Sequence, residues 1–265
     1  MRSLPSRFLV AAAAFIAALS CGDVPTLERG IAYVTPIILP SPAVAAGDVM
    51  RDSLGNPALL QVIAYDNNNA IIPGIAAHYL ITSPLPPAAP QTPLATVDSS
   101  SGKITATDTV TSLTLIARVG DRIQTTPATV LVVSQPDSVE ITSTLDSLQS
   151  FAKSGGLSVK VSSLRKGTRV TVDGIVVRYQ IVKVNGAPVD VGTHTLVDAN
   201  NAPLRIDARR AVDTTKNGGV ASRFLSPVSL TGVDSIVVEA RANSLKGTPL
   251  PGSPVRFVLP VKKGA

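Results

Sequence analysis

The chain of 265 residues contains one cysteine, no tryptophan and only 3% aromatic residues. A single cysteine excludes an intrachain disulfide, so the folded parts must be held by apolar burial, which is feasible for domains of about 100 residues. Scarce aromatic side chains argue against a platform for stacking sugars or nucleic-acid bases. The glycine pairs Gly155-Gly156 and Gly218-Gly219 lie in expected turns without a following helix, so they do not form a phosphate-binding loop.

Histidine is almost as rare, with only His78 and His194 in the chain. Two isolated histidines and one cysteine make neither a transition-metal site nor a nucleophile–base pair. The carboxylates are scattered over expected turns and strand edges, and nothing in the sequence selects a general acid–base pair. We therefore expect no enzyme, no metal site and no cofactor, and keep an enzyme of unrecognised type only as a remote alternative.

The residues that are abundant predict short strands separated by turns. The chain is 45% hydrophobic, mainly through valine, isoleucine, leucine and alanine, and it holds 21 prolines and 19 glycines. Its length fits about two domains. In the first half, strands are expected at residues 33–39, 59–65, 75–82, 112–119 and 128–133.

The second half of the chain repeats the first. Gly, Ile, Tyr and Ile of segment 74–81 recur in segment 174–181 at an offset of 100, and LLQVIAY (59–65) matches LSVKVSS (157–163). Further matches give offsets that grow to 115, 123 and 127, so the second unit holds extra loop length, above all between Ile181 and Val212. The Asn185-Gly186 hairpin dipeptide there predicts an additional β-ribbon.

The repeat predicts two tandem immunoglobulin-like β-sandwich domains, at residues 32–135 and 136–265. Because alternate residues of a strand face opposite sides, Tyr79 and Tyr179 should share one face with Ile81 and Ile181. His78 and Arg178 should then lie on the wetter face, and this fits a solvent-exposed histidine better than a catalytic one.

The N-terminus has the proportions of an export signal. Arg2 and Arg7 precede a run of twelve apolar residues, 8–19, which is too short for a comfortable permanent membrane span. Residues 1–20 are therefore expected to be a cleaved signal peptide. Cys21 follows the run directly and needs an explanation as the lone thiol of an exported protein.

Ala18-Leu19-Ser20-Cys21-Gly22 resembles the lipobox of bacterial lipoproteins. Ala18 departs from the pattern, which prefers Leu, Val or Ile at that position. The resemblance implies acylation of Cys21, stable membrane anchoring through several chains, and residues 21–31 as anchor and tether. Gly22, in place of an aspartate, fits delivery to the outer membrane or cell surface. An ordinary secretory signal is the alternative.

Two further segments carry a family resemblance. VDSSSGKITATD (97–108) and VDTTKNGGVASRF (212–224), each followed by an apolar strand, resemble the group 2 and invasin-type group 1 bacterial immunoglobulin-like domains of invasins, intimins and surface lipoproteins. The resemblance implies an all-β fold and a structural or adhesive role at the cell envelope. The buried tryptophan and paired cysteines of antibody domains are missing.

Positive charge is concentrated in the second unit. Residues 22–135 hold five basic and eight acidic residues (5 − 8 = −3), whereas residues 136–265 hold seventeen basic and ten acidic ones (17 − 10 = +7). Such clusters can attach electrostatically to anionic polymers, although a solvated surface explains them as well. The candidate anionic-ligand residues are Arg165, Lys166, Arg169, Arg209 and Arg210, with Lys262 and Lys263 near the C-terminus.

Oxygen-bearing side chains crowd at segments 66–69 (DNNN) and 198–201 (DANN). Neither has the acidic ligand count of a calcium loop, and Asp and Asn are also the usual turn residues. We therefore expect turns here rather than metal sites.

The sequence as a whole predicts a non-enzymatic cell-envelope lipoprotein that serves as a structural or interaction module. The alternative is an adhesin or anionic-polymer-binding lipoprotein that uses its basic second domain. The expected partners are the membrane, through the N-terminal lipid, and an envelope polysaccharide or protein. No specific nucleic-acid recognition is expected, because groove-reading elements and stacking aromatics are not apparent.

Overall fold

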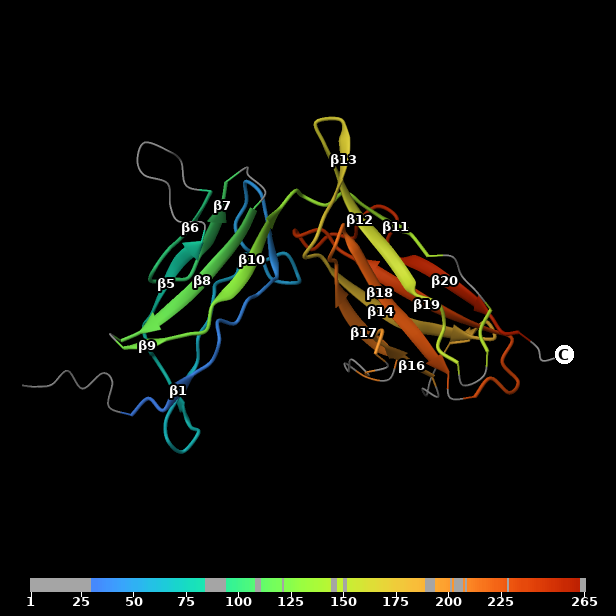
Figure 1. Cartoon of the computed structure of the whole chain (residues 1–265), viewed down its shortest axis with the longest axis horizontal. Coiled ribbons are helices and arrows are strands. Elements are labelled where there is room, and N and C mark those ends of the chain that lie inside the picture. The colour runs from blue at the N-terminus through green and yellow to red at the C-terminus, as the bar shows by residue number, and fades with distance from the viewer. Residues whose placement is uncertain are drawn as a thin grey trace, which may run out of the picture.

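The computed structural model shows two β-sandwich domains that lie end to end (Figure 1). It describes residues 30–83, 94–107, 111–120, 122–143, 147–149, 152–188, 194–200, 202, 207, 209–227 and 229–262. All regular elements in these ranges are strands. Among the same residues, no helix has the length and hydropathy needed to cross a membrane. The predicted signal peptide and Cys21 lie outside the described residues.

Domain 1 contains one broad sheet and two sets of short ladders. Its strands are β1 (Tyr33–Val34), β2 (Ala43–Ala45), β3 (Ala64–Tyr65), β4 (Ile71–Ile72), β5 (Ala77–Ser83), β6 (Ala95–Val97), β7 (Ile104–Ala106), β8 (Thr111–Val119), β9 (Ile123–Gln124) and β10 (Ala128–Val133). The broad sheet has the order β2-β10-β8-β5, with β9 paired to β8. The ladder β1-β3-β4 and the hairpin β6-β7 complete the domain.

Domain 2 is built from two five-stranded sheets. Its strands are β11 (Ser138–Ile141), β12 (Leu157–Arg165), β13 (Thr168–Thr171), β14 (Val176–Val184), β15 (Ala187–Pro188), β16 (His194–Val197), β17 (Arg210–Thr214), β18 (Val220–Pro227), β19 (Ser235–Ala242) and β20 (Val255–Pro260). One sheet has the order β11-β12-β18-β16, with β13 paired to β12. The other has the order β15-β14-β19-β20, with β17 paired to β14.

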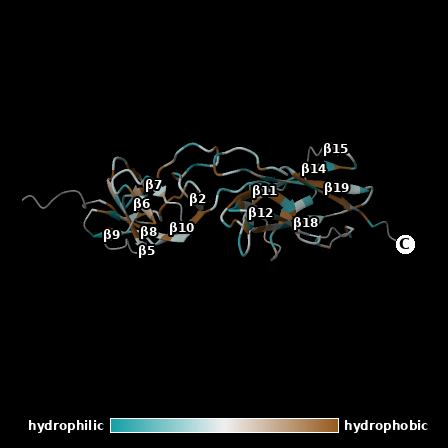
Figure 2. Cartoon of the chain, turned by 90° about the horizontal axis from the view of Figure 1, so that it is seen from above, coloured by the Kyte–Doolittle hydropathy of each residue, from teal (hydrophilic) through white to brown (hydrophobic). Residues whose placement is uncertain are grey.

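Both domains have immunoglobulin-like topology, as the sequence predicted. Their strand pairs are antiparallel except where an N-terminal segment runs parallel to the last strand. In domain 1 that pair is β2 with β10, and in domain 2 it is the bridge between Leu148 and Val261. Burial alternates along the strands, for example along β20, so one face of each sheet enters the core. In Figure 2, strands of domain 2 such as β14 and β19 are coloured largely brown, the colour of hydrophobic residues.

The internal repeat is visible in three dimensions. The pairing of β5 with β8 shifts register between Ile81 and Ser83, and the pairing of β14 with β19 shifts between Ile181 and Lys183, again 100 residues later. Tyr79 and Tyr179 are buried, while His78 and Arg178 are exposed. The predicted assignment of strand faces is therefore confirmed.

The register predicted for another repeat segment differs from the structure. The amide of Leu60 donates to the carbonyl of Gly102, and the amide of Val161 donates to the carbonyl of Gly219. Leu60 therefore corresponds to Val161, at an offset of 101 rather than the 98 of the sequence match. Short apolar segments match almost equally well after a slip of a few residues, and only their strand partners fix the register.

Three expected elements are shorter or differently placed, and one of them is segment 59–65, which forms a ladder only at β3 and one bridge at Gln61. Segment 33–39 forms a ladder only at β1 and one bridge at Ile38, because Pro36 has no amide hydrogen to donate. The Asn185-Gly186 turn does join a hairpin, β14 to β15. Beyond that hairpin, β16 pairs with β18 in the opposite sheet.

Candidate functional site

The hairpin β12–β13 projects from the end of domain 2 that faces domain 1 (Figure 1). Its two-residue turn has positive φ at Lys166 (48°) and Gly167 (79°), which is the twist that suits a tight hairpin. Arg165 and Thr168 face each other across the ladder next to the turn. The hairpin therefore gathers Arg165, Lys166 and Arg169 beside the interdomain linker, residues 134–137.

Arg169 is held against that linker. Its guanidinium lies 3.6 Å from Asp137 Oδ1, donates to Ser162 Oγ at 2.8 Å and also contacts Ser138 Oγ. Asp137 in turn accepts the Leu164 amide at 2.5 Å, and its own amide donates to the Ser162 carbonyl at 3.0 Å. Arg169 thus fixes the linker to the hairpin, while Lys166 at the tip is exposed.

Arg209 and Arg210 do not join this group. They lie at the start of β17, where Arg210 Nε is 2.6 Å from Asp207 Oδ2. That hydrogen bond is the main reason why the pKa of Asp207 is lowered. Arg210 pairs with Gln180, four residues along β14 from Val176, or about 13 Å further from the interdomain joint. The five basic candidates therefore form two separate groups, and Lys263 lies outside the described residues.

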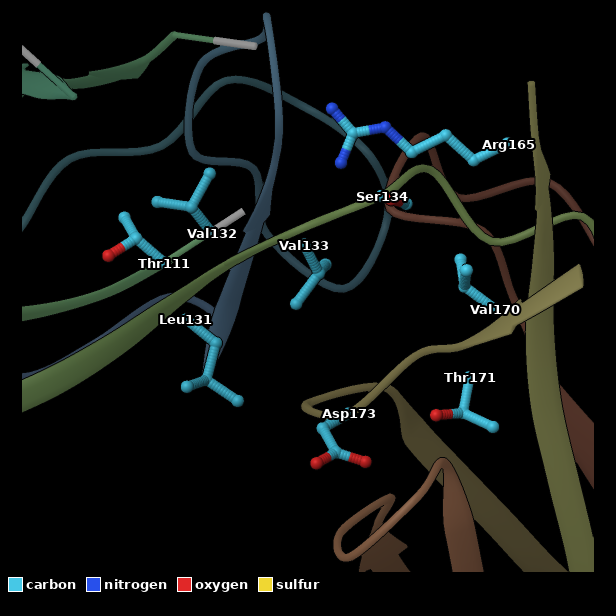
Figure 3. A pocket seen from close by; sticks show the side chains of 9 residues that line it. All are labelled: Thr111, Leu131, Val132, Val133, Ser134, Arg165, Val170, Thr171 and Asp173. Atoms are coloured by element: carbon cyan, nitrogen blue, oxygen red, sulfur yellow. The ribbon is translucent and has the colours of Figure 1, made fainter. Parts of the chain in front are cut away.

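A cleft of about 410 Å³ lies between the two domains (Figure 3). Its base is closed at Gly174, where an added Cβ would lie 2.8 Å from Ala43 Cβ and 3.2 Å from Leu131 Cδ1. The cleft is lined by Thr111, Leu131, Val132, Val133 and Ser134 from domain 1, and by Arg165, Val170, Thr171 and Asp173 from domain 2. A second hollow of about 270 Å³, on the linker side, shares Ser134 and Arg165.

The domains also touch through two glycine turns. An added Cβ on Gly55 would lie 2.1 Å from the Lys246 carbonyl oxygen, and one on Gly247 would lie 2.2 Å from the Leu54 carbonyl oxygen. Both glycines have positive φ, at 89° and 82°. Only residues without a Cβ permit this backbone-to-backbone approach. The two domains are therefore in close contact at Gly174 and at the Gly55–Gly247 pair.

The segments with crowded oxygen ligands form turns. Asp66 Oδ1 accepts the amides of Asn68 and Ala70, and Asp198 Oδ1 accepts those of Asn200 and Ala202 in the same pattern. Each carboxylate thus caps its own loop. Among the described residues, no group of three His, Cys, Asp or Glu side chains could hold a metal ion. Asn201 lies outside those residues.

His194 lies on β16 and is buried, and this burial lowers its pKa. A neutral imidazole is therefore favoured inside the sandwich. His78 of β5 is exposed.

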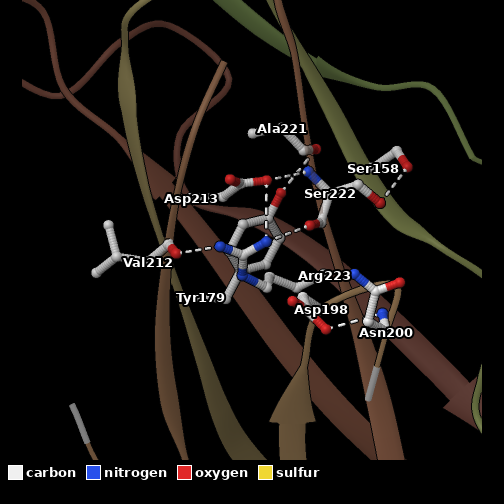
Figure 4. Close-up of polar contacts among 9 residues, drawn as sticks. All are labelled: Ser158, Tyr179, Asp198, Asn200, Val212, Asp213, Ala221, Ser222 and Arg223. Carbon is white, nitrogen blue, oxygen red and sulfur yellow. Dashed lines mark hydrogen bonds and ion pairs between the residues drawn. The ribbon is translucent and has the colours of Figure 1, made fainter. Parts of the chain in front are cut away.

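A buried polar network in domain 2 was not predicted from the sequence (Figure 4). Arg223 of β18 lies 3.1 Å from Asp213 Oδ2 of β17 and also donates to the Ser222 carbonyl at 2.9 Å. Asp213 accepts the Ser222 amide at 2.8 Å, and the Tyr179 hydroxyl donates to the Ala221 carbonyl at 2.9 Å. Burial, reinforced by Asp213, raises the pKa of Tyr179. The ion pair joins the two sheets, so its role is structural.

Comparison with known proteins finds distant similarity to solved structures. No family model and no curated protein matches the chain. Among solved structures, it is similar to the Yersinia pseudotuberculosis adhesin InvE (19% identity, TM-score 0.34, 89% of this chain and 61% of that one). It is also similar to domains 4 and 5 of the S-layer protein SbsC, with 13% identity and a TM-score of 0.29 over 89% of this chain and 100% of that one. The D0–D1 domains of intimin are similar with 14% identity and a TM-score of 0.27, over 87% of this chain and 96% of that one.

Proposed function

We propose that the chain is a non-enzymatic, lipid-anchored interaction module of the bacterial cell envelope, built of bacterial immunoglobulin-like domains. The observation that carries the proposal is the position of Cys21, directly after a basic N-terminus and a twelve-residue apolar run. Acylation at Cys21 would tether domain 1 to the membrane and leave domain 2 distal. The outer membrane or cell surface is the proposed location.

Two features of the folded domains support an interaction role. The sandwiches lie end to end and touch at Gly174 and at the Gly55–Gly247 turns, which suits projection of a surface away from a membrane. The cleft between them offers a concave surface of the size that ligands occupy, about 300–1,000 Å³.

Metabolic labelling with an alkyne-bearing fatty acid tests the proposal. The wild-type chain should incorporate the label and sediment with membranes, whereas Cys21→Ser should lose the label and appear in the soluble fraction. Ser20→Ala keeps the thiol and a small residue before it, and serves as the matched control. Absence of label on the wild-type chain would refute lipid anchoring.

The adhesin alternative draws on the exposed Lys166 at the tip of the β12–β13 hairpin, beside Arg165 and Arg169. A polyanion bound there should be released by salt, because exposed charges are screened. Binding of the full-length chain to an anionic polysaccharide across a salt series tests this idea. Lys166→Ala should weaken that binding, while Arg210→Ala, at the other basic group, is the control.

A further inference from the structure

We propose that the interdomain cleft binds a short extended peptide, which adds as a strand to the free edge of β13, with a basic residue near Asp173 and an acidic residue near Arg165. The inference deepens the proposed function, because it gives the interaction module a ligand class. It is argued from the orientation of the β13 backbone, the walls of the cleft and the charges at its ends.

The first step is the direction of the β13 backbone groups. In an antiparallel pair, alternate residues turn their amide and carbonyl groups toward the partner strand or away from it. The Val172 amide donates to the Val161 carbonyl of β12 at 3.0 Å, so Val172 and Val170 face β12. Arg169 and Thr171 therefore point their backbone groups away from β12.

The outward groups of Arg169 and Thr171 form an open strand edge. In the described part of the chain, β13 pairs with β12 alone, and no backbone hydrogen bond from either outward amide is found. Figure 3 shows Val170 and Thr171 of this strand on the domain 2 side of the cleft, across from Leu131 and Val133 of domain 1. An exposed edge of this kind accepts an added strand through main-chain hydrogen bonds.

The opposite wall consists of side chains. In domain 1, β10 is paired on both edges, with β2 and with β8, so it presents Leu131 and Val133 to the cleft rather than unpaired backbone. An incoming strand would thus find hydrogen-bonding groups on one side and apolar surface on the other. A cleft of about 410 Å³ lies at the small end of ligand-site volumes, which favours a few residues of peptide over a globular partner.

Charge then sets the direction and composition of the peptide. Arg165 lies at the hairpin tip and Asp173 follows the other end of β13, so the cleft has a positive and a negative end. A peptide antiparallel to β13 starts near Asp173 and ends near Arg165. A basic residue first and an acidic residue last complement both ends, and five residues span about 15 Å, similar to β13 with its flanks.

The experiment titrates the full-length chain, held in mild detergent, with a capped fluorescent pentapeptide of sequence lysine-valine-threonine-valine-glutamate. The control peptide exchanges the lysine and the glutamate. We expect the first peptide to bind at least about tenfold more tightly, the value of one charge-assisted contact. With Arg165→Glu the preference at that end should be lost, and the control peptide should bind better than before.

Backbone methylation tests the strand addition without altering the protein. One peptide carries N-methyl groups on its second and fourth residues, and another carries one on the third. Only one of these two sets can face β13, so the peptides should differ by about tenfold in affinity. Equal affinities, or no binding of the parent peptide at millimolar concentration, would overturn the proposal.

A protein variant gives the complementary measurement. Thr171→Pro removes an amide that points away from β12, so the β12–β13 ladder is kept while the open edge loses a donor. We expect about tenfold weaker binding of the parent peptide, and unchanged affinity would count against the proposal. Failure of the fatty-acid labelling would refute lipid anchoring but leave these peptide results standing, so the two proposals fail separately.

Discussion

Among the described strands, domain 1 has one of nine residues, β8, whereas domain 2 has two, β12 and β14. The buried hydrophobic cluster of domain 2 contains 25 of the described residues, and that of domain 1 contains 13. Two of the 25, Ala43 and Val133, belong to domain 1. Domain 1 is therefore expected to be the less stable unit and to gain stability from its contact with domain 2.

The glycine at one repeat position has different surroundings in the two domains, because only one copy lies at the domain junction. Gly74 and Gly174 occupy equivalent turns with φ near 73° and 80°. A Cβ on Gly74 would meet nothing within 4 Å, whereas one on Gly174 would press on Ala43 and Leu131. Gly74 is therefore required only by the backbone of its turn, whereas Gly174 also leaves room for the side chains of domain 1.

Removal of a large core side chain from domain 2 should have the largest effect on the difference in stability between the two domains. Phe257 is fully buried, so Phe257→Ala should lower the free energy of unfolding of domain 2 by about 3–5 kcal/mol. Two transitions in scanning calorimetry should then merge or exchange order. Val258, the next residue, is 55% exposed, and Val258→Ala should change stability by less than about 0.5 kcal/mol. Similar effects of both substitutions would contradict the burial assigned to β20.

The buried ion pair is the second difference between the domains. From the match of Gly102 with Gly219, Arg223 corresponds to Ala106, which is buried and apolar. Arg223→Ala should destabilise domain 2 by about 3 kcal/mol, because Asp213 loses the partner that compensates its charge. Chemical denaturation followed by circular dichroism measures this loss.

A double variant separates the charge effect from the loss of packing. Replacing Asp213 by Asn in the Arg223→Ala background removes the uncompensated charge and should recover part of the lost stability. If the double variant were less stable than Arg223→Ala by the full cost of a second independent substitution, the two residues would not be coupled.

Period-two burial and the repeat were predictable because they depend on local patterns. The tyrosine and histidine faces followed from strand alternation, and the turn at Asn185-Gly186 followed from its dipeptide. The strand edge at β13 and the separation of Arg165 from Arg210 could not be predicted, because each depends on which strands pair. The Asp213–Arg223 pair was missed for the same reason, since the sequence does not show that both side chains are buried between the sheets.

The glycine contact between the domains allows a test of their coupling. Gly55→Ala would place a Cβ 2.1 Å from the Lys246 carbonyl oxygen, so the two turns must separate. We expect a loss of about 1–2 kcal/mol, from the positive φ and the broken contact, and a longer maximum dimension in small-angle X-ray scattering. Gly74→Ala has a similar φ but open space around it, so it should cost only the backbone strain and leave the dimension unchanged. Equal scattering profiles for both variants would show that the Gly55 turn does not hold the domains together.

The smallest expected effect concerns the hydrogen bonds of Asp98 in domain 1, which differ from those of Asp213 in domain 2. Asp213 is paired with a guanidinium, whereas Asp98 Oδ1 accepts the Ser101 amide at 2.7 Å and the Ser101 and Ser100 hydroxyls at 2.9 and 2.8 Å. These bonds, led by the Ser101 amide, lower the pKa of Asp98 to about 2. The folded-state pKa lies below the ordinary value of 3.8, so the carboxylate stabilises domain 1 above about pH 4.

That contribution should be lost as the pH falls from about 4 to 2, and the loss should be confined to domain 1. A carbon-detected NMR titration of the Asp98 carboxyl should give a midpoint near 2. Ser101→Ala removes one hydroxyl donor but keeps the backbone amide, so it should raise the midpoint without unfolding the turn. A wild-type midpoint at 3.8 or above would mean that the hydroxyls and amides around Asp98 do not stabilise its charge in solution.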